Sequence, residues 1–423
     1  MNGSKLGRAS RQLTTVALVQ WAASPLMTEI ATRWQRVVLA VAVALCVAAS
    51  SPSYAETYTD AQGQTWTYTV NGRAATLTSS ADKTIAYLAE DFPWMFTNNG
   101  TNYTVTVLGD SVCSGWEAMT GTLTIPSTLK TINNGAFNAC KGLTRLKIEE
   151  GVSALPYRAF YSDNMIQGAL IIPHSVTDIG YQSFLWTGER LTSVWVKGPK
   201  KVASGTQPYT SIASGRGNIL YVNGNLGLKV ALFGPYTKTT GTGSYVLHTL
   251  NKCTVYVPRN GYWLEENLDS YFSGASKTVL FYGPGEELDI SIDEVKNVLT
   301  ATPTTVHALT NVMASAALFK SDFGLDTKIS ITNAFTYSAS TFTGTTARDV
   351  TFERLMFSVK TQAELTEILT AFPVPVKLAI DPVGLTGTLR IPGDREIHLK
   401  IGDGYTVKKR TSGFEILIEP TGR

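Results

Sequence analysis

A repeat of 23 to 24 residues constrains the fold of this chain more than any other feature of its sequence. Phe137, Phe160 and Phe184 are 23 and 24 residues apart, and each follows a segment of the form apolar-x-Ile. Apolar residues recur at fixed positions while the polar residues between them vary, which is typical of a solenoid of stacked repeats. The predicted repeat core consists of Leu123, Ile125, Ile132, Phe137, Leu146, Ile148, Leu155, Phe160, Leu170, Ile172, Ile179 and Phe184.

Each repeat is expected to start with a short strand. Leu-x-Ile alternates buried and exposed positions, as a strand with one buried face does. Pro126 and Pro173 follow two of these segments and should end the strands, because proline has no N–H for the ladder. Leu108 lies 24 residues before Ile132, and Cys113 lies 24 before Phe137, so an imperfect turn precedes the clear ones.

The repeats also resemble a known class. The segments LTIPSTLKTINNGAFNACKGL and LIIPHSVTDIGYQSFLWTGERL are similar to BspA-like leucine-rich repeats, and GQTWTYTVNGRAATLTS (63–79) resembles the hairpin that often opens such proteins. The resemblance covers roughly residues 56–285 and is most specific before 200. Asn133 and Pro156 stand where the family prefers Gly, so these repeats are degenerate. The resemblance implies a secreted or cell-surface protein of a class often linked to adhesion.

The N-terminus is typical of an export signal. Arg33 and Arg36 precede an apolar run at 37–49, and Ser53-Tyr54-Ala55 fits a cleavage site after Ala55. The run is too short for an ordinary membrane span, so the mature chain is expected to have none and to be secreted or at the cell surface. An uncleaved anchor is the alternative, and Met27 is an alternative start.

The sequence predicts a mainly β fold with short helices in four parts. Residues 1–55 are the signal region, 56–110 an N-terminal β cap, 111–285 an irregular solenoid that is degenerate after 196, and 286–423 a C-terminal domain. Strand-like segments at 219–224, 254–259 and 279–285 continue the solenoid, and 260–272 is expected to contain a short helix.

The C-terminal domain is expected to be α+β or solenoid-like. Strands are predicted at 288–293, 355–360 and 376–381, with helices at 304–319 and from the capping box Thr361–Glu364 to Ala371. Strand, helix and strand in this order favour a parallel pair with a crossover. GTLRIP at 387–392 repeats the wording of GTLTIP at 121–126, which is the argument for a solenoid-like end.

Little in the chain predicts chemistry. A 43% apolar and 16% charged composition indicates a folded protein, and a net charge of +3 gives no reason to expect nucleic-acid binding. The four histidines lack partners at ligand or triad spacing, and no catalytic motif is present, so we expect no enzyme activity, no cofactor and no metal site. Asp289, Asp293 and Glu294 could bind calcium, but a solvated strand face is the commoner case. Buried free thiols are favoured over a Cys113–Cys140 bridge.

The outward face of the repeat strands is the candidate recognition surface. Outward residues alternate with the buried ones, and the mixture of Arg, Lys and Trp expected there is enriched at binding sites. The candidate binding residues are Arg145, Lys147, Glu149, Ile171, His174, Trp195 and Lys197. The competing interpretation is that the loop after residue 198 covers Trp195.

Three hypotheses of function follow. The first is a secreted or surface-displayed, non-catalytic binding or adhesion protein that presents the repeat face to an extracellular protein or glycan. The second is a structural surface component without a specific ligand, which assembles through exposed strand edges. The third is a secreted carbohydrate-active enzyme with its site in 286–423, which two carboxylates facing each other across a cleft would support.

Overall fold

The computed structural model describes residues 54–187, 190–212, 227–240, 246–248, 250–274, 276–331, 335–336, 350–371, 378–382, 384–392, 397–399, 405–410 and 415–420. The compact unit discussed below begins at Glu56. The predicted signal region, apart from Tyr54 and Ala55, and the predicted strand at 219–224 lie outside the described residues. Both stay predictions.

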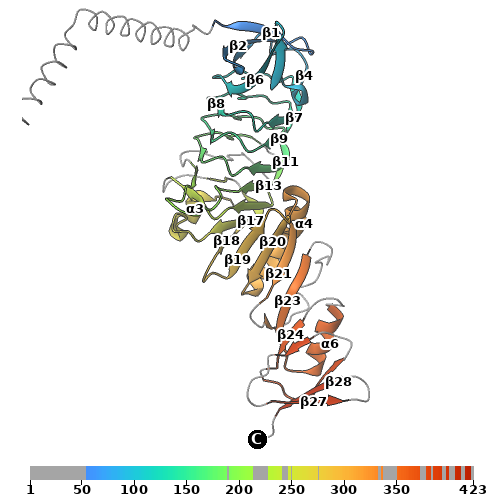
Figure 1. Ribbon diagram of the computed structural model, residues 1–423. Coiled ribbons are helices and arrows are strands. Elements are labelled where there is room, and N and C mark those ends of the chain that lie inside the picture. Colours follow the sequence, from blue (N-terminus) through green and yellow to red (C-terminus); the bar gives the residue numbers. More distant parts are fainter. Residues whose placement is uncertain are drawn as a thin grey trace, which may run out of the picture. The chain divides into compact units, whose positions relative to one another are not determined.

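The N-terminal cap is a six-stranded sheet with strand order β1-β2-β3-β6-β5, in which β8 pairs with β6 (Figure 1). The strands are β1 (Glu56–Thr59), β2 (Thr65–Asn71), β3 (Ala74–Ser80), β5 (Met95–Asn98), β6 (Thr101–Leu108) and β8 (Thr131–Ile132). Trp66 and Tyr68 alternate with threonines along β2 and are buried. The short elements β4 (Tyr87–Leu88) and η1 (Ala89–Asp91) lie in the predicted aromatic segment before β5.

The solenoid is built from two ladders of parallel strands. The long strands are β7 (Met119–Ile125), β9 (Leu143–Ile148), β11 (Gln167–Ile172), β13 (Arg190–Val196), β15 (Val230–Phe233), β17 (Asn251–Pro258) and β18 (Ser276–Tyr282). The short strands are β10 (Ala154–Leu155), β12 (Asp178–Ile179), β14 (Thr210–Ile212) and β16 (Thr237–Thr239). β4, β7 and β9 form one sheet, β11, β13, β15, β17 and β18 a second, and the four short strands a third.

The register confirms the repeat alignment. Leu123 lies opposite Leu146, Leu170 opposite Val194, and Leu108 opposite Ile132, as the spacing predicts. β7 and β11 end directly before Pro126 and Pro173. The two strands predicted at 254–259 and 279–285 are β17 and β18, and the predicted short helix corresponds to η2 (Glu265–Asn267) and α3 (Leu268–Tyr271).

The phenylalanine column fills the centre of the solenoid. Phe137 and Phe160 stack with ring centroids 5.6 Å apart, and Phe160 and Phe184 with centroids 5.3 Å apart. All twelve predicted core residues are buried. Cys113, Cys140 and Cys253, the cysteines of the described chain, are buried free thiols, which confirms the favoured interpretation. Each turn therefore buries its aromatic ring against the next turn, as a repeat that cannot form a core alone must do.

The C-terminal region has a seven-stranded sheet with strand order β19-β20-β21-β23-β24-β26, in which β22 pairs with β23. Its elements are β19 (Leu288–Asp293), β20 (Val298–Pro303), α4 (Val306–Phe323), β21 (Asp326–Ser330), β22 (Phe335–Thr336), β23 (Val350–Ser358), α6 (Gln362–Ala371), β24 (Leu378–Asp381) and β26 (Ile397–Leu399). β20 and β21 are parallel and joined through α4, and β23 and β24 are parallel and joined through α6. The predicted crossover is thus confirmed.

The repeated wording GTLRIP does not make a further solenoid turn. It forms β25 (Leu389–Pro392), which pairs antiparallel with β28 (Glu415–Pro420), and β28 pairs antiparallel with β27 (Tyr405–Arg410). A solenoid strand would need a parallel neighbour one repeat away, whereas this strand forms a small antiparallel sheet. Of the two forms expected for the C-terminal region, the one with helices and sheets is correct.

Two hydrophobic cores lie side by side. The first runs from the cap through the inner side of the solenoid, from Trp66 to Phe281. The second contains α4 and the C-terminal sheet, but also outward residues of the late solenoid strands. These outward residues are Trp195, Val230, Leu232, Tyr256, Leu280 and Tyr282. The solenoid therefore has apolar side chains on both faces from β13 onward, and the C-terminal region covers the second face.

Candidate functional site

The predicted recognition face is exposed at the early turns. Thr122 lies opposite Arg145, and Thr124 opposite Lys147, on neighbouring parallel strands β7 and β9. Arg145 and Lys147 are exposed, and Lys147 forms an ion pair of 3.2 Å with Glu149 at the end of its strand. An exposed pair of this kind contributes little to stability, so these charges are available to a partner.

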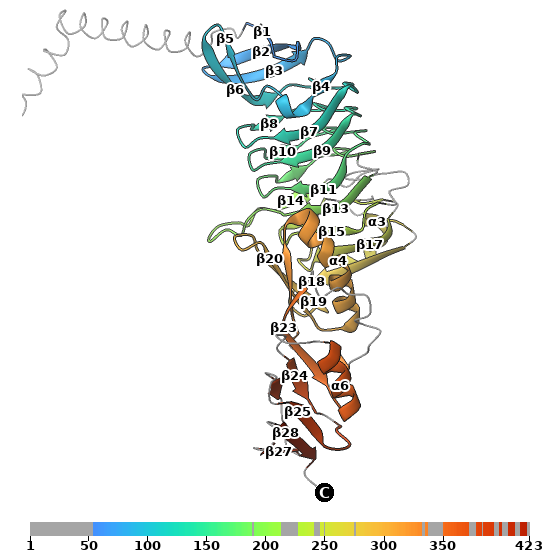
Figure 2. The ribbon, with the colours of Figure 1, turned by 90° about the vertical axis from the view of Figure 1, so that its right-hand side faces the viewer.

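The same face is covered at the later turns, and the prediction of an exposed Trp195 is wrong. Trp195 is only 3% exposed, and its ring lies 5.5 Å from that of Phe323 in α4. Ile171, its neighbour on β11, is half-buried against the same core. Figure 2 shows α4 beside the strands β13, β15 and β17. The cover is helix α4 of the C-terminal region, and not the loop after residue 198.

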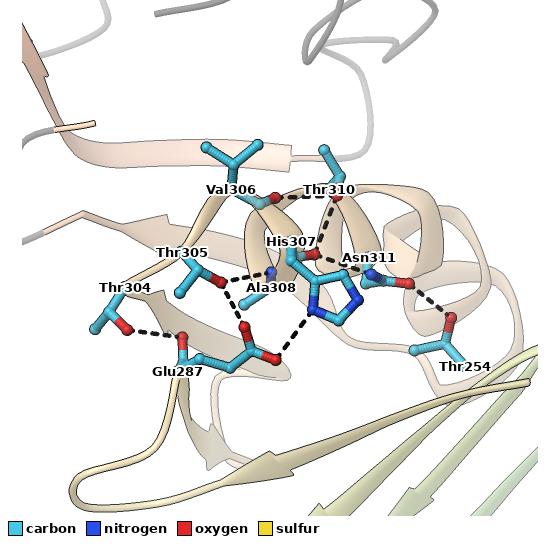
Figure 3. Close-up of polar contacts among 9 residues, drawn as sticks. All are labelled: Thr254, Glu287, Thr304, Thr305, Val306, His307, Ala308, Thr310 and Asn311. Carbon is cyan, nitrogen blue, oxygen red and sulfur yellow. Dashed lines mark hydrogen bonds and ion pairs between the residues drawn. The ribbon is translucent and has the colours of Figure 1, made fainter. Parts of the chain in front are cut away.

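Polar contacts fix α4 to the solenoid. The hydroxyls of Thr192 and Ser193 donate to one carboxylate oxygen of Asp322, at 2.5 and 2.6 Å. Tyr256 Oη and Ser315 Oγ are 2.8 Å apart, and Thr254 donates to Asn311 Oδ1 at 3.2 Å (Figure 3). Each bond joins an outward residue of a solenoid strand to α4, so this interface is specified by both polar and apolar contacts.

Glu287 organises the start of α4 (Figure 3). Its carboxylate accepts from the Thr305 hydroxyl at 2.5 Å and lies 3.1 Å from His307 Nδ1, while its carbonyl accepts from the Thr304 hydroxyl at 3.2 Å. Thr305 caps the helix by accepting from the Ala308 N–H at 3.1 Å. A carboxylate near the positive end of a helix stabilises it, so we assign this network to holding α4 in place.

A second polar cluster joins the edge of the solenoid to the end of β19. His174 Nε2 lies 2.5 Å from Glu294 Oε1, and Lys197 Nζ lies 2.6 Å from Glu294 Oε2. His174 Nδ1 lies 2.5 Å from the carbonyl oxygen of Gly198. Both partners of the ring can only accept, so the imidazole satisfies both when each nitrogen carries a proton.

The electrostatics agree with this geometry. Burial lowers the pKa of His174, but the hydrogen bonds to Glu294 and Gly198 outweigh burial and raise the pKa above its ordinary value. The bond from His174, together with Lys197, lowers the pKa of Glu294 to about 2. His174 and Lys197, predicted as parts of an open binding face, instead hold β19 against the solenoid.

A cavity of about 440 Å³ lies beside this cluster. Its walls come from the end of β13 with the segment that follows it, from residues 234–236, from the end of β18 and from β19. The predicted residues His174, Trp195 and Lys197 line it. The sequence analysis missed Lys200 and Lys201, which also line it, because the segment KGPKK was interpreted only as a loop.

The described residues give little support for catalysis or for metal binding. The cavity is lined by one carboxylate, Glu294, which is already held by two cationic partners. Glycoside hydrolysis generally uses two carboxylates. Asp293 binds Lys296 at 2.9 Å, and no group of three or more His, Cys, Asp or Glu side chains in the described part of the chain is placed to hold a metal ion. No helix among these residues is long and apolar enough to cross a membrane.

Comparison with known proteins identifies the repeats. Residues 104–201 match the model of the BspA type leucine rich repeat region, in six copies. No curated protein matches the chain.

Several solved structures are similar to it. A leucine-rich repeat protein from Bacteroides capillosus is 26% identical, with 34% of this chain and 99% of that chain covered and a TM-score of 0.27. A leucine rich cell surface protein from Faecalibacterium prausnitzii is 14% identical, with 84% and 97% covered and a TM-score of 0.27. The pneumococcal vaccine antigen PcpA is 12% identical, with 82% and 99% covered and a TM-score of 0.23.

Proposed function

We propose that this protein, whose residues 104–201 form a BspA-type leucine-rich repeat region, is a non-catalytic binding protein of the cell surface or the extracellular space. Its partner is an extracellular protein or glycan, and its recognition surface is the outward face of β7 and β9. A solenoid presents an extended surface of regularly spaced side chains, which suits it to such a partner. The predicted signal region supports export.

The observation that carries the proposal is the contrast along one strand face. Arg145 and Lys147 are exposed on β9, whereas Ser193 and Trp195 are buried at the equivalent positions of β13. The C-terminal region therefore closes the late turns and leaves the early turns open. Neighbouring strands are about 4.8 Å apart, so Thr122, Thr124, Arg145 and Lys147 form one compact, positively charged patch. Such a patch favours an acidic region of the partner.

The test is binding of the purified protein to a panel of extracellular-matrix proteins and glycans. The variant Arg145→Ala/Lys147→Ala should lose at least tenfold in affinity for the partner found, because it removes both charges of the patch. The matched control is Lys360→Ala/Arg390→Ala, which removes two exposed charges from the C-terminal region. Both variants should unfold at the midpoint of the wild-type protein.

Three results would contradict the proposal. Equal binding by the Arg145/Lys147 variant and the wild-type protein would exclude the early-turn face. Loss of binding only in the control would place the site in the C-terminal region. Absence of any binding, together with concentration-dependent self-association, would favour the structural alternative. N-terminal sequencing of the exported protein tests the secretion hypothesis separately, with Glu56 as the expected first residue.

A further inference from the structure

We propose that the cavity beside Glu294 is a second binding site, which takes the acidic group and the adjoining ring of an acidic sugar. This site is separate from the early-turn face and requires a different ligand. Arg145 and Lys147 do not line the cavity. The inference rests on the charge, the wall composition and the size of the cavity.

The cavity carries more positive than negative charge. Lys197 and the His174 imidazole share Glu294, so that carboxylate is already balanced. Lys200 and Lys201 are exposed at the cavity and form no ion pair with any described residue. A ligand with one carboxylate or sulfate would therefore meet two unpaired ammonium groups. Charge-assisted hydrogen bonds of this kind are among the stronger polar contacts.

The other walls are apolar and aromatic. Tyr236, Tyr282 and Trp195 contribute rings, and Ile290 and Ile292 contribute aliphatic surface from β19. Tyr282 is held rigidly, because its hydroxyl donates to the Phe233 carbonyl at 2.6 Å. A sugar ring has a face of C–H groups that packs against such walls, whereas a free inorganic anion has none. The cavity therefore favours an anion attached to a ring over a bare anion.

The buried Trp195 indole gives an independent indication. Its Nε1–H is buried and has no acceptor among the described residues. Buried donors without a partner are uncommon, and each needs an explanation. Trp195 lines the cavity, so an oxygen of a bound sugar is a candidate acceptor.

The size of the cavity sets the extent of the ligand. About 440 Å³ lies within the range of small-molecule sites and holds one or two sugar rings. Lys200 and Lys201 are exposed, so the cavity is open on their side. We therefore expect a terminal acidic residue of a glycan, whose remainder leaves through the open side.

The experiment is calorimetric titration of the purified protein with N-acetylneuraminic acid and with glucuronic acid. Galactose serves as the neutral sugar, and inorganic phosphate as the anion without a ring. We expect saturable binding of at least one acidic sugar, binding at least tenfold weaker for galactose and phosphate, and weaker binding of the acidic sugar as salt is added.

The variant Lys200→Gln/Lys201→Gln should weaken binding of the acidic sugar about tenfold or more, because both lysines lie in exposed positions and their replacement should not disturb folding. The matched control Lys130→Gln/Lys252→Gln, which changes two exposed lysines outside the cavity, should bind as the wild-type protein does. Tyr236→Ser should also weaken binding, because it removes part of the wall.

The inference is overturned if neither acidic sugar binds, or if phosphate binds as tightly as the sugars do. Unchanged binding in the Lys200/Lys201 variant would overturn it as well. The variant Arg145→Ala/Lys147→Ala should retain sugar binding. Failure of the early-turn proposal and failure of this inference are thus distinguishable.

Discussion

The early and late turns of the solenoid share one backbone register but differ in the environment of their outward faces. On β7 and β9 the second outward column consists of Thr124 and Lys147, and Lys147 is exposed. From β11 to β18 the same column consists of Ile171, Trp195, Leu232, Tyr256 and Leu280. The change coincides with the boundary between the two sheets of long strands. An apolar outward column therefore marks the turns that a neighbouring region covers.

The inner columns show no such change. Leu123 and Leu146 in the early turns, and Val194 and Val255 in the late turns, are all buried in the first core. The inner face is needed by every turn for stacking, whereas the outward face is apolar only where α4 and β19 lie against it. The two faces of a repeat strand thus answer to different requirements.

The largest expected effect comes from breaking the inner column that both regions share. Phe160→Ala removes the ring between Phe137 and Phe184 and should destabilise the protein by about 3–5 kcal/mol, because it leaves a cavity in a packed column. Chemical denaturation measures the change. Trp186→Ala, at a position 43% exposed, is the control and should change stability by less than about 0.5 kcal/mol. A loss below about 1 kcal/mol for Phe160→Ala would show that the column does not carry the core.

The second prediction breaks the outward comparison directly. Trp195→Ala should cost about 3 kcal/mol, because it removes the contact with Phe323. Thr124→Ala, in the same column on the open side, should cost less than about 0.5 kcal/mol. Hydrogen exchange should show faster exchange in α4 for the first variant only. Equal costs for the two variants would mean that α4 does not cover the late turns in solution.

The third prediction concerns a polar exception in the inner face. Asp163 is fully buried, accepts from the Cys140 N–H at 2.7 Å through Oδ1, and has no partner for Oδ2. Burial raises the pKa of this carboxyl well above its ordinary value. The folded protein therefore holds the proton more tightly than the unfolded chain does, and stability falls as pH rises above the ordinary pKa.

Replacing this carboxyl with an amide should remove that dependence. Asp163→Asn keeps the acceptor and adds a neutral donor, so it should stabilise the protein by about 2 kcal/mol at about pH 8. The difference should shrink on going to about pH 5, as thermal unfolding at the two values will show. If the variant is less stable than the wild-type protein at both values, the buried carboxyl has a partner that an amide cannot replace.

The smallest expected effect concerns the cluster that holds β19 against the late turns. His174 has a raised pKa, so its contribution is present below its ordinary value of 6.5 and is lost as pH rises through the raised pKa. Glu294 has a pKa lowered to about 2, so its contribution is present above its ordinary value of 4.5 and is lost as pH falls through about 2. The contact should be strongest between these ordinary values, from 4.5 to 6.5.

His174→Gln should lower stability by on the order of 1 kcal/mol inside this window and by less at higher pH, because both partly exposed partners are screened by solvent. Hydrogen exchange of β19 across pH measures the effect. An identical pH profile in the variant and the wild-type protein would remove His174 from the contact.

The sequence by itself determined the repeat. Its period placed Leu123 opposite Leu146 and stacked Phe137, Phe160 and Phe184, because stacking of identical short units is a local rule that apolar spacing expresses fully. It also located α4, α6 and the strands joined through them, since helix periodicity and a capping box are local signals as well.

Only the tertiary structure decided which outward residues meet solvent. Ile171 and Trp195 have the composition of a binding face, and within one or two repeats nothing distinguishes an open face from one covered by a segment more than a hundred residues later. The cavity at Lys200 and Lys201 depends on the same long-range packing, because its walls come from separate solenoid turns and from β19. Burial of an outward face is a property of the partner element as much as of the strand, and the period of the strand carries no information about that partner.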